Sequence, residues 1–335
     1  MYGSSSRIAI TGAGLVTPYA RNRSGSWQQL CAGVRAIHQL TPDECAARSI
    51  HGAGAVGQPD LLPAMPGAPV IWPEEQIVGL ELPADIDPLL AFAVQATQEA
   101  VEQSRILPAG ADPRRVGGVF GTSKGGLVAA GRLWQAADGR QKTSAIAVTQ
   151  TQPTSLLTNA YGLFDEVAPS CAVSELGRRW RLGGPLLAPI AACATGLLAL
   201  IRGAALIREG VCDAVIAGSS DASVLLPVIA SFRRLGVLAA GASEPGTACR
   251  PFDRDRRGFH VGEGAGCLVL ERWDHAVARG APVLGEWLNG LQRGAPEGIT
   301  VLPDDPACLV RLIRDLLQRL DLSPHDIDAV ALHGT

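Results

Sequence analysis

Two segments far apart in the chain show the same order of structural signals. Asp87-Pro88 opens an apolar-periodic segment that predicts a helix, and a proline turn then leads to a buried strand at 115–122 that ends in Gly-Thr. Asp305-Pro306 opens a second helical segment, followed by a Ser-Pro turn and a strand at 327–335 that ends in His-Gly-Thr. The repeat indicates an internal duplication of one αβ unit, with two unrelated αβ units as the alternative.

Other apolar segments continue this alternation of helices and strands, which predicts an α/β fold. Further strands are predicted at residues 7–18, 186–193, 214–219 and 266–270. The first of these is expected to end in a glycine turn similar to a dinucleotide-binding loop. Thr17 stands where that loop needs its third glycine, and Pro18 interrupts the following helix, so we reject a Rossmann site. Residues 41–87 are proline-rich and aperiodic, and predict a long surface excursion.

Composition and charge exclude several classes of protein. Apolar residues make up 47% of the chain and charged residues 18%, which excludes an intrinsically disordered protein. The formal net charge of −3 indicates no basic surface for nucleic acid or for an anionic membrane. The uncharged stretch 182–201 is long enough for a membrane span, but its glycines and prolines favour a buried strand running into a buried helix.

The eight cysteines are scattered, and no two form a Cys-x-x-Cys pair, so we expect neither a metal site nor a disulfide framework. The start of the chain has no apolar segment of the kind that directs secretion, and we expect a cytoplasmic protein. Gly262, Gly264 and Gly266 alternate along the chain and match no phosphate-binding loop. They suit a backbone packed closely beneath an active site.

Cys193 has the context of a reactive cysteine. In Ile190-Ala-Ala-Cys193-Ala-Thr-Gly196 it stands where a predicted strand ends and an Ala- and Leu-rich helix begins. The positive end of a helix dipole favours the thiolate, and backbone N–H groups at such a turn suit an oxyanion. The small residues Ala194, Thr195 and Gly196 are expected to leave room for a substrate carbonyl. A buried structural cysteine is the alternative.

His333 is the second candidate for chemistry. It stands at the predicted C-terminal end of the last strand, which is where open α/β sheets place their ligands. An ordinary loop histidine is the alternative. A cysteine and a histidine at matching strand ends indicate acyl-transfer chemistry.

Five short motifs follow one another along the chain. They are Ile-Thr-Gly-Ala-Gly near the start, Ala-Ala-Cys-Ala-Thr-Gly around Cys193, Arg-Pro-Phe-Asp at 250–253, Gly-Glu-Gly-Ala-Gly at 262–266 and His-Gly-Thr at 333–335. In this order and spacing they resemble the β-ketoacyl-acyl carrier protein synthases, condensing enzymes of the thiolase superfamily in fatty acid and polyketide synthesis. The resemblance implies a thiolase-like fold, a duplicated α/β/α/β/α layered sandwich whose second half is incomplete here. It predicts an N-terminal ketoacyl synthase half at 1–280 and the start of the C-terminal half at 281–335.

The resemblance also implies the roles of the site residues and the partners. Cys193 would take an acyl group as a thioester from an acyl carrier protein, and its backbone N–H would stabilise the oxyanion. His333 matches the first of two family histidines that assist decarboxylation of the malonyl donor. The reaction is then a decarboxylative Claisen condensation with no bound cofactor, since the substrates travel on the phosphopantetheine arm of the carrier protein. The family pairs through the strand before the nucleophile, here 186–192, so we expect a homodimer or a heterodimer with a related synthase.

Several positions depart from the family pattern. The second histidine and the segment that completes the oxyanion hole lie beyond His333 in the family, so we expect the 335-residue chain alone not to complete a condensation. Ala194 follows the nucleophile where Ser or Thr is more usual, and Arg257 stands where an acidic residue is common. Lys124 occupies what looks like the position of an apolar residue that shapes the acyl pocket. There it would disfavour long acyl chains, unless its ammonium reaches solvent instead.

Three other functions are considered beside the leading one. They are a non-catalytic homologue that acts as a dimer partner of the chain-length factor type, a degenerate homologue, and a thiolase that uses coenzyme A. The presence of Cys193 argues against the non-catalytic partner. The motifs Arg-Pro-Phe-Asp and His-Gly-Thr favour the carrier-protein branch over the thiolases.

Overall fold

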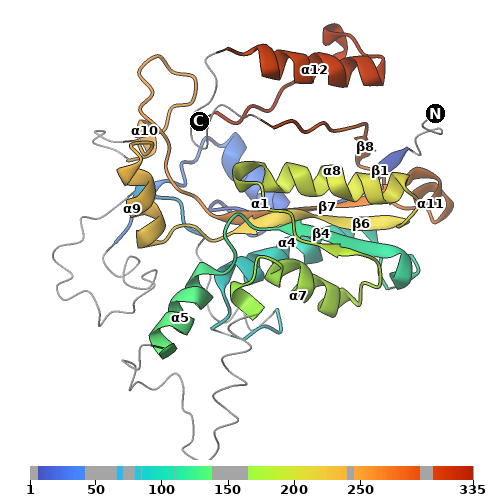
Figure 1. Ribbon diagram of the computed structural model, residues 1–335, viewed down its shortest axis with the longest axis horizontal. Coiled ribbons are helices and arrows are strands. Elements are labelled where there is room, and N and C mark those ends of the chain that lie inside the picture. Colours follow the sequence, from blue (N-terminus) through green and yellow to red (C-terminus); the bar gives the residue numbers. More distant parts are fainter. Residues whose placement is uncertain are drawn as a thin grey trace, which may run out of the picture.

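A mixed β-sheet forms the centre of the molecule (Figure 1). The computed structural model describes residues 7–41, 66–70, 80–83, 85–108, 110–137, 165–239, 245–294 and 305–334. Within these residues the sheet has six strands in the order β5-β4-β6-β7-β1-β8, and β2 and β3 pair separately. The strands are β1 (Ile8–Val16), β2 (His38–Gln39), β3 (Pro66–Gly67), β4 (Val116–Gly121), β5 (Leu186–Leu187), β6 (Ala214–Asp221), β7 (Gly264–Arg272) and β8 (Gly285–Trp287).

Strand β4 runs parallel to β5 and β6, whereas β7 runs antiparallel to its neighbours β6 and β1. The carboxyl ends of β4 and β6 therefore meet at one edge of the sheet, which is where an α/β fold places its ligands. This parallel arrangement confirms the α/β fold expected from the sequence. Most of the proline-rich excursion at 41–87 lies outside the described residues.

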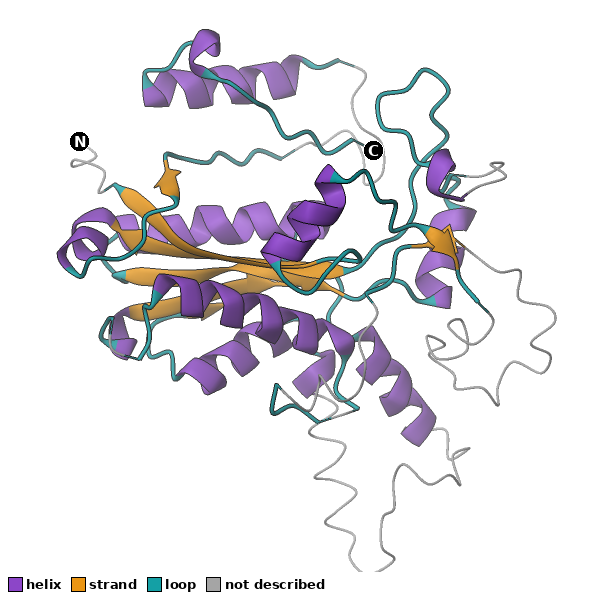
Figure 2. Ribbon diagram, turned by 180° about the vertical axis from the view of Figure 1, so that it is seen from behind, coloured by secondary structure: helices purple, strands orange, loops and turns teal. Residues whose placement is uncertain are grey.

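Helices cover both faces of the sheet, α8 on one face and α4 with α7 on the other (Figures 1 and 2). The helices are α1 (Arg23–Cys31), α4 (Pro88–Ser104), α5 (Leu127–Ala137), α7 (Cys171–Trp180), α8 (Thr195–Arg208), α9 (Leu226–Arg234), α10 (Pro245–Ala248), α11 (Trp273–Ala278) and α12 (Ala307–Leu320). The helices predicted after Asp87-Pro88 and Asp305-Pro306 are both present as α4 and α12. In the described part of the chain, no helix is long and apolar enough to cross a membrane.

The alternation of side chains along β6 explains how one strand serves two cores. Ala214 and Ile216 belong to the core beneath α4 and α7, and Val215 and Ala217 belong to the core beneath α8. Successive side chains of a strand point to opposite faces, so a sheet covered on both faces needs apolar residues at every position. This requirement accounts for the continuous apolar run that marked β6 in the sequence.

The glycines near the start of the chain have a packing role and do not form the predicted turn. Gly12 and Gly14 lie within β1, so the glycine turn expected after this strand is wrong. A Cβ at Gly14 would lie 1.8 Å from the carbonyl oxygen of Ala96 in α4, and one at Gly12 would lie 2.0 Å from that of Ala100. Glycine on the strand and alanine on the helix thus allow the two backbones to touch.

Asp87 holds the starts of two helices with one buried carboxylate. One of its side-chain oxygens accepts from the backbone N–H of Leu89 at 3.1 Å in α4, and the other accepts from that of Ala129 at 3.0 Å in α5. Burial raises the pKa of this carboxyl, since the site disfavours its charge, while these backbone hydrogen bonds oppose the shift. The sequence signal Asp-Pro therefore orders two elements at once.

We expect Asp87→Ala to lower the free energy of unfolding by about 1–3 kcal/mol, because both helix starts lose a hydrogen-bond acceptor. Urea denaturation followed by circular dichroism measures the change. Asp112→Ala is the matched control, since Asp112 caps a short turn at the surface and its side chain is 40% exposed. Equal losses in the two variants would contradict the double-cap assignment.

The second αβ unit is only partly formed as the sequence predicts. Helix α12 and the turn at Pro324–Asp326 are present, but residues 327–334 form no strand. A strand needs a neighbour for its backbone hydrogen bonds, and none of the described strands lies beside this segment. Val330 is accordingly 69% exposed and Leu332 65% exposed.

Candidate active site

Cys193 lies in a short 3₁₀ turn (Ala192–Ala194) directly before α8, and it is exposed. The strand predicted at 186–193 ends at Leu187, because Pro189 has no N–H to continue the ladder. Ala192 has a φ of 47°, a left-handed conformation that residues with a Cβ rarely adopt. Within the described residues, the Cys193 backbone N–H donates to no carbonyl. The turn thus presents a thiol and an unused N–H together.

Thr195 holds this strained turn closed. Its hydroxyl donates to the carbonyl oxygen of Ala192 at 2.7 Å and accepts from the backbone N–H of Ala191 at 2.9 Å. Thr195 is 3% exposed, so these hydrogen bonds are shielded from water. The hydroxyl thereby bridges the two residues that precede Cys193.

Glycines bring the ends of β4 and β6 against the start of α8. A Cβ at Gly121, the last residue of β4, would lie 2.3 Å from the carbonyl oxygen of Pro189 and 2.5 Å from the Thr195 methyl. A Cβ at Gly196 would lie 2.7 Å from Ser219 Oγ in β6. Thr195 and Gly196 therefore pack against the ends of β4 and β6, whereas Ala194 is exposed. That these small residues leave room for substrate stays a prediction.

We expect Thr195→Val to slow alkylation of Cys193 about 10- to 30-fold. Valine keeps the methyl beside Gly121 but loses both hydrogen bonds, together worth about 2 kcal/mol. Thr195→Ser keeps the hydroxyl and should restore the rate to within about 3-fold. The measurement is the pH profile of alkylation by iodoacetamide, taken beside thermal unfolding. A valine variant that loses stability but keeps the parent profile would contradict the positioning role.

The other cysteines in the described residues are poorer nucleophiles or lie in other surroundings. Burial raises the pKa of Cys171 and of Cys267 to about 12, and it also raises the pKa of Cys212. A thiol with a pKa of about 12, as Cys171 and Cys267 have, is almost wholly protonated at neutral pH and does not attack a thioester. Cys31 is exposed on α1, and Cys249 and Cys308 are partly exposed. Cys45 lies outside the described residues.

His333 is exposed, and no hydrogen bond or ion pair joins it to Cys193 in the described residues. The next residue, Gly334, lies against the Arg-Pro-Phe-Asp motif, since a Cβ there would be 3.2 Å from Cβ of Pro251. Figures 1 and 2 show the C-terminal segment returning to the end of the sheet where α9 and α10 lie. Two of the motifs found in the sequence are therefore neighbours, while the role of His333 stays a prediction.

Of the three alternating glycines, Gly264 alone makes a close backbone approach. A Cβ there would lie 2.3 Å from the carbonyl oxygen of Val16, and its φ is 154°. Gly262 and Gly266 have space for a side chain, so close packing explains one of the three positions. The buried Glu263 between them accepts from the backbone N–H groups of Val70 and Val224, and so ties two loops together.

The Lys124 ammonium lies in a polar cluster, and its side chain is only partly exposed. Its ammonium donates to Ser123 Oγ at 2.6 Å and to Ser223 Oγ at 2.9 Å, and it lies 3.3 Å from Asp221 Oδ2. Both hydroxyls also donate to the Asp221 carboxylate. The sequence contained no signal for this network beyond the lysine itself, because its members come from two separate segments.

Comparison with known proteins agrees with this geometry. The family model described as the N-terminal domain of β-ketoacyl synthase matches residues 5–276. The mitochondrial 3-oxoacyl-[acyl-carrier-protein] synthase of Arabidopsis thaliana is 29% identical over 339 residues, an alignment that covers 100% of this chain and 71% of that protein. The oxytetracycline polyketide putative β-ketoacyl synthase 1 of Streptomyces rimosus is also 29% identical, with 98% and 72% covered.

Solved structures show the same fold. A β-ketoacyl synthase from Burkholderia phymatum superposes with a TM-score of 0.73 at 25% identity, over 98% of this chain and 74% of that one. The AntDE:AntF complex, a type II polyketide synthase acyl-carrier protein with its ketosynthase, gives a TM-score of 0.76 at 24% identity, over 99% and 74%. The thiolase-like fold expected from the motifs is therefore confirmed. The chain belongs to the β-ketoacyl synthase family.

Proposed function

We propose that this protein is an acyltransferase of the condensing type, a β-ketoacyl synthase that receives an acyl group on Cys193 and extends it with a malonyl unit. The observation that carries the proposal is the strained turn at Ala192–Ala194, which presents an exposed thiol beside an unused backbone N–H. The relatives named above as 3-oxoacyl-[acyl-carrier-protein] synthase and polyketide β-ketoacyl synthase support it. Cys193 itself is exposed, so the thiol is open to a substrate from solvent.

The first half-reaction follows from this geometry. The Cys193 thiolate attacks the thioester carbonyl, and the backbone N–H of Cys193 donates to the oxyanion that forms. The carbon–sulfur bond of the donor then breaks, and its phosphopantetheine leaves as a thiolate, which takes up the proton that Cys193 lost on ionisation. The acyl group remains as a thioester on Cys193.

In the second half-reaction, a malonyl thioester loses carbon dioxide, and the resulting enolate attacks the acyl-Cys193 carbonyl. Carbon–carbon bond formation releases the Cys193 thiolate, so the electrons and the leaving group balance. Loss of carbon dioxide generates the carbon nucleophile without a strong base, and the scheme therefore uses no metal and no resident cofactor. His333 is proposed to stabilise the enolate, a role that rests on its match to the first of the two family histidines.

The proposal includes an acyl carrier protein as partner and pairing with a second synthase chain. Strand β5 is an outer strand of the described sheet, with Leu186 40% exposed, and Ile190 beyond it is 54% exposed. Apolar residues at a free sheet edge favour a homodimer or a heterodimer with a related synthase. A cytoplasmic location is also proposed, in agreement with the free thiols of the described cysteines. A non-catalytic partner role is not favoured, because the nucleophile Cys193 is present and lies exposed in the turn before α8.

The carrier-protein part of the proposal is tested by presenting one acyl group in two forms, on an acyl carrier protein and on free pantetheine. We expect acylation from the carrier protein to have at least about 10-fold higher kcat/KM, because the protein surface adds binding energy that pantetheine lacks. Equal values would contradict the carrier protein as partner. Absence of acylation from both donors would contradict the function itself.

A further inference from the structure

A polar network lies beside the candidate active site, and the proposed chemistry makes no use of it. It consists of Ser123 and Lys124 after β4, and of Asp221 and Ser223 at the end of β6. We propose that this network is a subsite that selects acyl chains carrying a hydroxyl group over purely alkyl chains. The proposal rests on the proposed function, since it concerns the acyl group attached to Cys193.

The position of the network is fixed by the strands that carry it. Gly121 of β4 touches Pro189 and Thr195, and Ser219 of β6 touches Gly196, so both strand ends lie against the turn of the nucleophile. Lys124 follows Gly121 by a few residues, and Asp221 is the last residue of β6. An acyl group on the exposed Cys193 therefore starts at the end of the sheet that also carries the network.

The network is both rigid and accessible. The backbone N–H of Val224, next to Ser223, donates to the buried Glu263, and that of Gly125, next to Lys124, donates to the buried Thr122 hydroxyl at 2.6 Å. The side chains of Lys124 and Asp221 are nevertheless 31% and 33% exposed. A bound chain can therefore cover these charges without displacing the residues that hold them.

The hydrogen bonds inside the network decide what it can recognise. Lys124 directs its ammonium at two hydroxyls and a carboxylate, which together take up its three N–H groups. Ser123 and Ser223 each have one O–H group, and each donates it to the Asp221 carboxylate. What remains free are lone pairs on the hydroxyl and carboxylate oxygens, so the network can accept hydrogen bonds but has none left to donate.

A ligand group that matches such a surface is a donor. A hydroxyl on the acyl chain can donate to Asp221 or to a serine oxygen and replace the water there, whereas a keto group can only accept. An alkyl chain in the same place would strip water from Lys124 and Asp221 and return no hydrogen bond. The network thus favours hydroxylated chains for two reasons. A hydroxyl gains a hydrogen bond there, and an alkyl chain loses free energy because it removes water from charged groups.

The test compares acylation of Cys193 by eight-carbon acyl thioesters that are alkyl, keto, or hydroxylated at different carbons. We expect at least one hydroxylated donor to exceed the alkyl donor about 10-fold in kcat/KM, as a hydrogen bond to a charged group would give. In the double variant Lys124→Met/Asp221→Leu, this preference should vanish or reverse. A matched control is Arg202→Met/Glu209→Leu, which should keep the preference. It removes an exposed ion pair of 3.2 Å between α8 and the residue that follows its C-terminal end.

The outcomes of this comparison distinguish failure of the subsite from failure of the proposed function. An equal ratio of hydroxylated to alkyl rates in the parent, or the same ratio in parent and double variant, would overturn the subsite. If the double variant fails to fold, Ser223→Ala takes its place and should reduce the ratio at least about 3-fold. Acylation without preference leaves the proposed function intact, whereas absence of acylation from every donor overturns both.

Discussion

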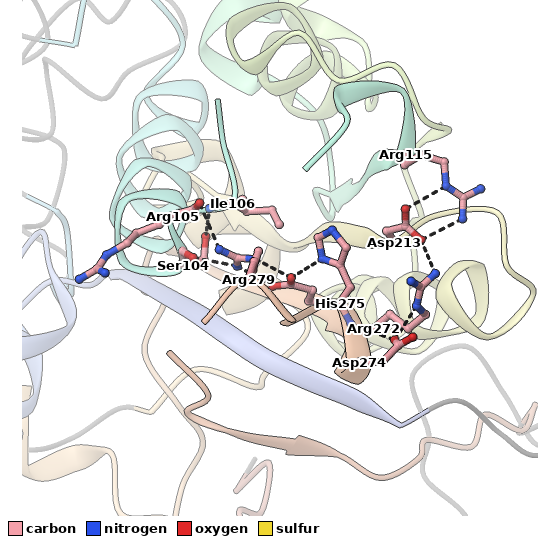
Figure 3. Close-up of polar contacts among 10 residues, drawn as sticks. Ser104, Arg105, Ile106, Arg115, Asp213, Arg272, Asp274, His275 and Arg279 are labelled. Atoms are coloured by element: carbon pink, nitrogen blue, oxygen red, sulfur yellow. Dashed lines mark hydrogen bonds and ion pairs between the residues drawn. The ribbon is translucent and has the colours of Figure 1, made fainter. Parts of the chain in front are cut away.

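Replacing Glu271 with alanine is expected to lower the free energy of unfolding by about 3–5 kcal/mol. Glu271 is wholly buried at the end of β7. Its carboxylate accepts two hydrogen bonds from Arg279, each at 2.7 Å, and lies 2.6 Å from His275 Nδ1. Arg279 in turn donates to the carbonyl oxygen of Ser104 at 2.8 Å, as Figure 3 shows. Alanine would leave the Arg279 guanidinium, 14% exposed, without its counter-charge.

The control for this prediction is an ion pair of similar geometry at the surface. Glu286 lies 2.6 Å from Arg7, whose side chain is 57% exposed. Solvent screens such a pair, so Glu286→Ala should cost less than about 1 kcal/mol. Urea denaturation measures the free energy of unfolding of both variants. Equal stability of the Glu271 and Glu286 variants would contradict a stabilising role of the buried pair.

Cys193→Ala is expected to reduce transfer of acyl groups to the protein below detection, because no other described cysteine stands in a comparable turn. The pKa of Cys171 and Cys267, raised to about 12 by burial, leaves only about one thiol in ten thousand ionised at pH 8. Cys31 is exposed, but it is the last residue of α1 and therefore has no helix N-terminus beside it.

The matched control is Cys31→Ala, which removes an exposed thiol and should leave acyl transfer at the parent level. Intact-protein mass spectrometry after incubation with an acyl thioester measures the covalent acyl group in each variant. Comparable acylation of the parent and the Cys193 variant would mean that the nucleophile lies elsewhere.

Local signals predicted the elements that surround the site. Asp87 before Pro88 marked the start of α4, because an acidic cap and a proline act within one helical turn. The apolar run around Ile216 marked β6, because a strand covered on both faces must be apolar throughout. The order of the motifs around Cys193 and His333 then indicated the fold.

Contacts between distant segments could not be predicted in the same way. The hydroxyl of Thr195 closes the turn of the nucleophile only because that turn bends back on itself, and the pairing of Lys124 with Asp221 requires β4 and β6 to lie side by side. The prediction of a strand at 327–335 was wrong for a related reason. Its sequence has strand character, but a strand forms only against a partner, and none lies beside it in the described residues.

The most direct test of the account is to map where an acyl group attaches to the unmodified protein. The chain is incubated with a limiting amount of acyl-acyl carrier protein, digested, and examined by peptide mass spectrometry across all eight cysteines. The account predicts one acylated peptide, carrying the modification on Cys193. Modification mainly at Cys171 or Cys267 would contradict it, since both thiols are buried and protonated in this fold.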